Sequence, residues 1–181
     1  MLDEQIKEPT PSASVDVTPR AVPKGRSRIR LRPLERRDIE AVFVICKAAH
    51  ERAPARVFKF SRTKFDGHIE AYFHRTNQQA AIVAEIEGRI VGFAWMRCGT
   101  FTYSDEDRLA SVLTLNVDHA TTAPFTRARL FSSLISACKA VAEDWGALQT
   151  TVHVTSGMDA GHADRLLRRR GAEFVGGNYV L

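Results

Sequence analysis

Cysteine is scarce in this chain of 181 residues, and the three that occur, Cys46, Cys98 and Cys138, are far apart. Their number is odd, and their spacing fits neither a zinc site nor a CxxC redox pair. We therefore predict no metal site and no disulfide framework. We expect three reduced thiols that pack as small apolar residues.

Long apolar runs are also absent. No stretch approaches the roughly 18–20 residues of a membrane span, and residues 1–8 lack the basic start and apolar block of a secretion signal. We expect a cytoplasmic protein with no membrane partner. With 44% hydrophobic and 26% charged residues, the chain can bury one core of ordinary size.

Positive charge is in mild excess, with 26 Lys and Arg against 21 Asp and Glu, a net charge of +5 and a pI of about 9.4. Such an excess suits an anionic small ligand, a nucleic acid or an acidic partner. An ordinary basic surface explains it equally well, so charge alone identifies no partner.

Residues 1–27 form a segment of their own. Four of the seven prolines lie there, and the remainder is Ser, Thr, Val and mixed charge without a period. Such a segment buries too little apolar surface to offset its ordering entropy. We predict a disordered, proline-containing tail, or an arm that docks on a protein partner or on a second copy in a homodimer.

Hydrophobic periodicity from residue 28 to residue 181 predicts one domain. Gly88 suits the tight turn of a hairpin. The order is β-α-α-β-β-β-α-β-α-β, which predicts an α/β (mixed α+β) fold: a central mixed β-sheet flanked by helices on both faces. The predicted strands are 27–33, 80–86, 89–96, 110–117, 148–155 and 173–181, and the predicted helices are 34–52, 63–76, 124–145 and 163–170.

The most informative segment runs from Leu113 to Trp145. A strand there passes through a polar turn into an amphipathic helix, an arrangement that presents helix N–H groups to a phosphate. Arg127 and Arg129 stand where such a turn usually carries glycines.

Several segments resemble the GCN5-related N-acetyltransferase (GNAT) superfamily. Residues 82–94, Ile-Val-Ala-Glu-Ile-Glu-Gly-Arg-Ile-Val-Gly-Phe-Ala, are similar to the family's hairpin motif, which is the strongest match. The resemblance extends over residues 28–181. The other matching segments are residues 29–38, 113–117, 146–154 and 166–171.

This resemblance implies an acyl-CoA-binding domain that transfers an acetyl group from acetyl-CoA to an amine acceptor, a small molecule or a peptide, by direct attack. In the family, a bulge in the fourth strand contacts the acetyl and pantetheine arm. The turn that follows holds the pyrophosphate. The cofactor-binding positions that the resemblance implies are Leu115, Asn116, Val117, Thr126, Arg127, Ala128 and Arg129.

The chain departs from the family in its phosphate-binding turn and at its catalytic Tyr, among other positions. Counting back from the helix end at Gly146 places the family's three glycines at Arg127, Arg129 and Phe131. The family's thiolate-protonating Tyr falls at Leu167. Arg127 and Arg129 can take over phosphate charge, or they are solvated residues of the first helical turn. Ser156 and Tyr179 are candidate replacement hydroxyls.

Two histidines are candidate catalytic bases. His119 follows the fourth strand and His153 lies in the fifth, and an ordinary imidazole pKa of about 6.5 suits proton transfer from an amine. A surface turn histidine and a satisfied sheet histidine are the alternatives. A group of aromatic residues forms either an acceptor pocket or ordinary core: Phe58, Phe60, Phe65, Tyr72 and Phe73.

Two other functions stay open. The departures favour a catalytically inactive GNAT-like binding or structural module, for example a phage, mobile-element or virion accessory protein. A nucleic-acid-binding helix is the third interpretation, but no aromatic residues interleave with its arginines. We therefore favour the solvated face of an amphipathic helix and expect no nucleic acid partner. These arginines are Arg165, Arg168, Arg169 and Arg170.

Overall fold

The computed structural model describes residues 28–74, 78–153 and 160–175. Strands and helices alternate at both ends of this region, with a meander between them, as predicted. The elements are β1 (Arg30–Pro33), η1 (Arg36–Asp38), α1 (Ile39–Arg52), η2 (Pro54–Val57), α2 (Arg62–His74), β2 (Gln79–Ile86), β3 (Arg89–Thr100), β4 (Arg108–Val117), α3 (Pro124–Asp144), β5 (Ala147–Val152) and α4 (Ala160–Arg168).

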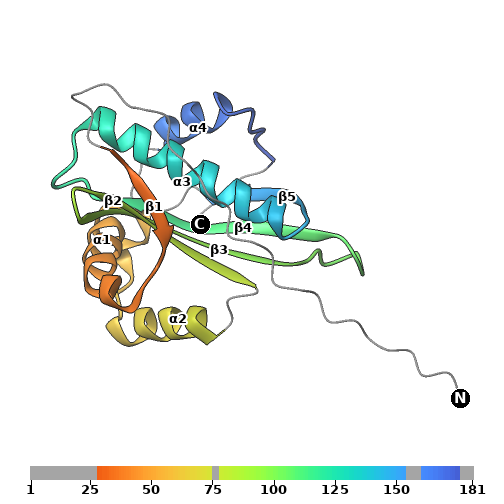
Figure 1. Cartoon of the computed structure of the whole chain (residues 1–181), viewed down its shortest axis with the longest axis horizontal. Helices are drawn as coiled ribbons and strands as arrows, with labels where there is room; N and C mark the ends of the chain where they lie inside the picture. Colours follow the sequence, from red (N-terminus) through yellow and green to blue (C-terminus); the bar gives the residue numbers. More distant parts are fainter. Residues whose placement is uncertain (1–27, 75–77, 154–159, 176–181) are drawn as a thin grey trace, which may run out of the picture.

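The five described strands form one sheet in the order β1-β2-β3-β4-β5. Neighbours are antiparallel from β1 to β4, whereas β4 and β5 are parallel and are joined by the crossover helix α3. Helices α1 and α2 cover one face, and α3 and α4 cover the other (Figure 1). The predicted mixed sheet with helices on both faces is confirmed.

Each face of the sheet buries its own apolar cluster. On the α3 face, Leu130, Leu134, Cys138 and Ala142 recur every four residues and are at most 1% exposed, which is the stripe of an amphipathic helix. Gly92 lets α3 approach the sheet, because a Cβ there would lie 3.2 Å from the Leu134 Cδ1. On the other face, residues of α1 and α2 pack on β2 and β3.

The β2–β3 hairpin turns at Glu87 and Gly88, which have φ values of 51° and 78°. A two-residue turn with positive φ at both positions is the kind that matches the twist of paired strands. The predicted hairpin is therefore confirmed.

Several boundaries differ from prediction; β3, for example, extends to Thr100 rather than to Met96. The first helix does not begin at Leu34, because a 3₁₀ turn (Arg36–Asp38) precedes α1. The Asp38 carboxylate holds this turn by accepting from the Glu35 N–H at 2.9 Å and from the Arg32 guanidinium. The predicted final strand is not present at residues 173–175, and residues 176–181 lie outside the described region, as does the predicted tail.

All three cysteines are buried and unpaired. Among the helices of the described region, none is long and apolar enough to cross a membrane.

Candidate functional site

A β-bulge interrupts β4 at Leu113. Trp95 of β3 pairs with Thr114 and Met96 pairs with Val112, so Leu113 has no partner on β3. A bulge of this kind re-aims the strand beside it. Both Leu113 and Thr114 line the same cavity on the α1–α2 side of the sheet.

The strands β4 and β5 part at the same place. Their pairing ends at Val112 and Val152, after which the His153 N–H donates to the Val112 carbonyl at 3.1 Å. Among the described strands, none pairs with β4 on this edge from Leu113 to Val117. The bulge therefore lies at the mouth of the gap between β4 and β5.

The turn at residues 118–123 leads from β4 into α3 and is organised by Asp118. The Asp118 carboxylate accepts from the Ala120 N–H at 2.9 Å and from the Thr121 hydroxyl, and the Asp118 carbonyl accepts from the Thr122 hydroxyl. Side-chain hydrogen bonds thus shape a turn that contains no glycine.

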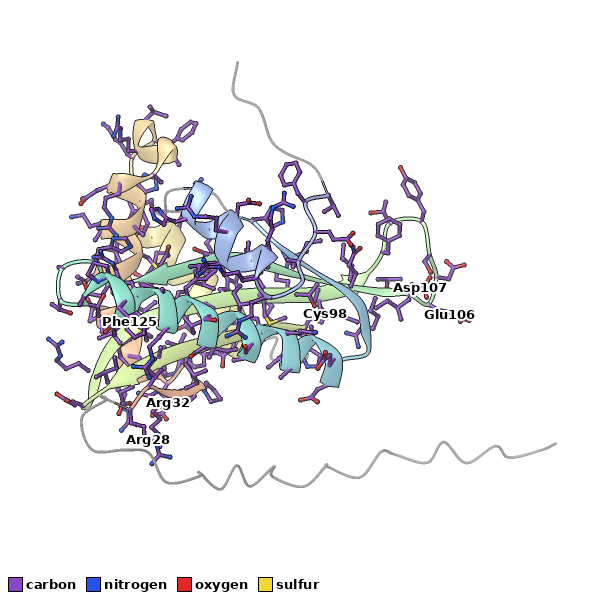
Figure 2. All side chains as sticks on the ribbon, turned by 90° about the horizontal axis from the view of Figure 1, so that it is seen from above. Arg28, Arg32, Cys98, Glu106, Asp107 and Phe125 are labelled. Carbon is purple, nitrogen blue, oxygen red and sulfur yellow. The ribbon has the colours of Figure 1, made fainter. Side chains whose placement is uncertain are left out.

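Helix α3 opens with an uncapped amino end. Pro124 occupies its first turn, and Ala123 supplies no side-chain cap. The first N–H groups of a helix have no intrahelical partner and favour an anion. The first turn contains no acidic residue. Figure 2 shows Phe125 at this end of the molecule, opposite the hairpin tip where Glu106 and Asp107 lie, so that acidic loop does not neutralise the site.

The arginines of the predicted phosphate site occupy different positions in this helix. Arg127 ends the first turn, and its guanidinium donates to the His119 carbonyl at 3.3 Å. Arg129 is half-buried and has no ion pair with any described residue. Phe131 is 4% exposed in the core and lies in the second turn of α3, beyond the turn that opens the helix. Thr126 and Ala128 are half-buried beside these arginines.

His119 lies half-buried in this turn. Burial lowers its pKa, and the positive charges of Arg52 and Arg127 lower it further, against the opposing effect of Asp118. A neutral ring at pH 7 follows. His119 does not line the cavity, and His153 is exposed where β4 and β5 part.

The three predicted cofactor residues of β4 face two ways. Leu115 and Val117 are buried in the cluster on the α3 face, so only their backbone groups are available to a ligand. The Asn116 side chain points to the opposite face, into the cavity.

The cavity has a volume of about 390 Å³. It lies between the sheet and the segment α1–η2–α2. Three residues of the predicted aromatic pocket line it, whereas Phe58 is 71% exposed and Phe73 packs beneath the Arg36 guanidinium. The aromatic lining consists of Phe60, Phe65, Tyr72, Phe93 and Trp95.

Asn116 is 5% exposed at the floor of this cavity. Its Nδ2 donates to the Thr114 Oγ1 at 3.1 Å and to the Cys46 Sγ at 3.5 Å. Burial raises the pKa of Cys46 to about 12, which keeps it a neutral thiol. The Asn116 Oδ1 is buried and has no hydrogen-bond partner among the described residues. Such an atom is rare in a folded protein and marks a place for a ligand donor.

Several lining residues were not predicted from the sequence. Trp95 carries the one usable signal, because it lies two positions after Phe93 and so shares its face of the strand. The basic lining residues carry no signal in the sequence, because they are separated along the chain. They are His50, Lys59, Lys64 and His68. No group of three or more metal-ligating side chains occurs in the described region.

Solved structures share this architecture. A transcriptional regulator from Bacillus halodurans has a TM-score of 0.66 at 13% identity, over 85% of this chain and 99% of that one. Glucosamine-6-phosphate N-acetyltransferase from Arabidopsis thaliana has a TM-score of 0.64 at 11% identity, over 85% and 97%. The aminoglycoside N-acetyltransferase AAC(6')-Iy, solved with CoA, has a TM-score of 0.61 at 14% identity, over 89% and 97%. The chain has the GNAT fold.

The similarity is one of structure. No model of a known protein family matches this chain, and no curated protein sequence matches it. At these identities the comparisons establish the GNAT fold, and acetyl transfer is the activity named for several of the neighbours that share it.

Leu167, where we expected the family's Tyr from the sequence, packs partly buried on the α3-side core. The candidate hydroxyls of Ser156 and Tyr179 lie outside the described residues.

The arginines near α4 are partly engaged within the protein. Arg168 pairs with Asp164 one turn earlier at 2.9 Å, and Arg170 donates to the hydroxyls of Ser132 and Ser136 on α3. Arg165 and Arg169 are exposed and have no ion pair with a described residue.

Proposed function

We propose that this protein is an N-acetyltransferase that moves the acetyl group of acetyl-CoA to an amine held in the cavity beside the β4 bulge. One observation carries the proposal. The bulge at Leu113 stands between the gap where β4 leaves β5 and a cavity with a buried, unpartnered amide oxygen. The two substrates of an acetyl transfer need adjoining sites of this kind.

The amino end of α3 would hold the cofactor's pyrophosphate. The N–H groups of the first turn favour an anion, and Arg127 and Arg129 add charge. The turn does not need glycines if side-chain hydrogen bonds fix its shape, and those of the Asp118 carboxylate do so here. Thr126 and Ala128 flank Arg127 in α3 and would complete the segment that contacts the pyrophosphate. CoA is bound in one of the neighbouring structures, which supports the same use of the fold here.

The open edge of β4 would bind the acetyl and pantetheine arm. A backbone N–H at the bulge can donate to the thioester carbonyl and stabilise the oxyanion that develops there. Leu115, Asn116 and Val117 continue this edge beyond the bulge. The acetyl group would then lie near Leu113, where the bulge is, rather than near Val117.

The reaction would be a direct attack. The amine nitrogen forms a bond with the acetyl carbon, the carbon–sulfur bond breaks, and the electron pair leaves on the CoA sulfur. The proton lost by the amine goes to a base, and the thiolate takes a proton from water. No covalent enzyme intermediate is needed.

Three histidines are candidates for the base that accepts the proton of the amine. His119 is kept neutral by its lowered pKa, and His153 stands at the gap. His50 lines the cavity, and its Nε2–H donates to the Phe58 carbonyl at 2.7 Å, which leaves Nδ1 as the basic nitrogen of the neutral ring. Single Gln variants separate them, because loss of the base removes the acidic limb of the pH–rate profile.

The activity test is acetyl-CoA-dependent release of free thiol in the presence of a panel of primary amines. The proposal expects turnover with at least one amine and acetylation of that amine by mass spectrometry. Binding of acetyl-CoA without turnover on any amine would instead favour the inactive binding module.

A further inference from the structure

We infer that the acceptor amine carries an acidic group, with its amine at Asn116 on the cavity floor and its acid at Lys59 and Lys64 on the rim. This inference rests on the proposed function and specifies its substrate class: an amine with an aromatic or other apolar body and a carboxylate or phosphate at the far end.

The floor of the cavity offers a single, oriented hydrogen-bond acceptor. Both donors of the Asn116 amide are used, on Thr114 and Cys46, so its Oδ1 faces the cavity without a partner among the described residues. A buried acceptor calls for a donor, and an amine N–H is one. The Asn116 amide reaches back along β4 to Thr114, the residue that follows the bulge, so an amine bound at its Oδ1 lies on the bulge side of Asn116, toward the acetyl group.

The rim of the cavity is positively charged. Lys59 precedes α2 and Lys64 lies in its first turns, and both are exposed. Neither has an ion pair with a described residue. His50 and His68 add positive charge when protonated, and no Asp or Glu of the described residues lines the cavity.

Three carboxylates of α1 and α2 are already engaged in ion pairs. Arg62 binds both Glu40 and Asp66, at 2.5 and 2.8 Å. Arg36 binds Glu70 at 2.7 Å. The field of the two lysines is therefore left for a ligand, and a charged rim of one sign attracts the opposite charge.

The walls between floor and rim are apolar. Phe60, Phe93 and Trp95 supply aromatic surface, and the Trp95 indole is fixed because its Nε1–H donates to the Gln79 Oε1 at 3.1 Å. A ligand that spans floor and rim passes this surface, so its body is apolar.

The test uses matched compounds that differ only at the far end: 4-(aminomethyl)benzoate, 4-(aminomethyl)phenylphosphonate and the neutral 4-(aminomethyl)benzamide. Binding to the full chain is measured by calorimetry without acetyl-CoA, at low salt. We expect at least one anionic compound to bind tenfold or more tightly than the benzamide. The tighter of the two anions then assigns the acid as carboxylate or phosphate.

Charge-matched variants locate the effect. Lys59→Gln with Lys64→Gln should weaken binding of the anionic compounds tenfold or more and leave the benzamide unchanged. Lys47→Gln with Lys139→Gln removes the same charge outside the cavity, from exposed lysines that pair with Glu51 and Glu143, and should change neither.

Asn116 is tested by two substitutions. Asn116→Leu should weaken the binding of all three amines. Asn116→Asp keeps an acceptor oxygen and should retain that binding. Equal binding of the anionic and neutral compounds, no binding of any of them at 10 mM, or equal losses in both lysine pairs would overturn the inference. Failure of acetyl transfer would show separately, as absent acetyl-CoA binding or turnover while these compounds still bind.

Discussion

The His153 N–H and the Val112 carbonyl lie 3.1 Å apart and close the last described hydrogen bond between β5 and β4. The next residue of β4, Leu113, is the one without a partner on β3. The strand is thus freed on one edge and bent on the other within two residues. These two features together open the sheet beside the cavity.

Deleting Leu113 should remove the bulge and leave the fold. Thr114 stays opposite Trp95 and Val112 opposite Met96, so alternation still sends Val112 and Leu115 to the α3-side core. We expect cooperative thermal unfolding to persist and acetyl transfer to fall by at least a hundredfold. Deletion of Asp105 from the exposed β3–β4 loop is the matched control and should keep its activity. Equal activity of the two deletions would show that the bulge has no catalytic part.

Leu134→Ala should destabilise the protein by about 2–5 kcal/mol, the usual cost of a cavity at a fully buried leucine. Leu134 is 0% exposed between α3 and the sheet, where it also meets Gly92. Leu148→Ala, at a residue that is 77% exposed on β5, should change the free energy of unfolding by less than about 0.5 kcal/mol. Urea titration of both variants checks this, and similar midpoints would contradict the described core.

Asp38 should make the free energy of unfolding depend on pH in the acidic range. Its hydrogen bonds from Arg32 lower its pKa, helped by the Glu35 N–H and opposed by burial. A lowered carboxyl pKa stabilises the fold above the unfolded value of about 3.9 and loses that contribution as pH falls toward the folded value. Urea titrations from pH 7 to pH 3 should show the loss below about pH 4.

Asp38→Asn is the variant that isolates this effect. It should cost about 1.5–3 kcal/mol at pH 7, because the largely buried Arg32 loses its charge-assisted hydrogen bonds to Asp38 and keeps only Glu85 and Glu35 as charged partners, and it should flatten the acid dependence. Asp66→Asn, in a pair that is 44% exposed on both sides, should cost about 1 kcal/mol or less. Similar losses in both variants would refute the special role of the Arg32–Asp38 pair.

His119 should report the arrival of the cofactor's phosphates. Burial and the charges of Arg52 and Arg127 lower its pKa, and a bound pyrophosphate would oppose those charges and raise it. Histidine titration by NMR should show the shift with CoA and none with pantetheine, which lacks the pyrophosphate. His74, exposed at the end of α2 beside Glu70, is the control, and its ring resonances should not respond to CoA or to pantetheine. An unmoved His119 in CoA-saturated protein would place the phosphates elsewhere.

Much of the fold was predictable because its determinants are local. The four-residue recurrence of Leu130, Leu134 and Cys138 identifies α3 and its buried face, and the Glu87–Gly88 pair identifies the hairpin. The fold class needed only the order of such elements.

The site was less predictable because it depends on distant residues. The bulge at Leu113 is set by register against β3, and a run such as Val-Leu-Thr-Leu fits a regular strand equally well. The orientation of the Asn116 amide depends on Cys46, which lies 70 positions earlier.

The most direct test of the central claim is calorimetric titration of the protein with acetyl-CoA. Wild type should bind it. Arg127→Glu with Arg129→Glu should weaken binding at least a hundredfold while folding normally, because acidic residues suit a helix amino end. Arg165→Glu with Arg169→Glu, the same charge change on α4, should bind as wild type does. No heat of binding at millimolar acetyl-CoA, or equal weakening in the two variants, would contradict a cofactor site at the start of α3.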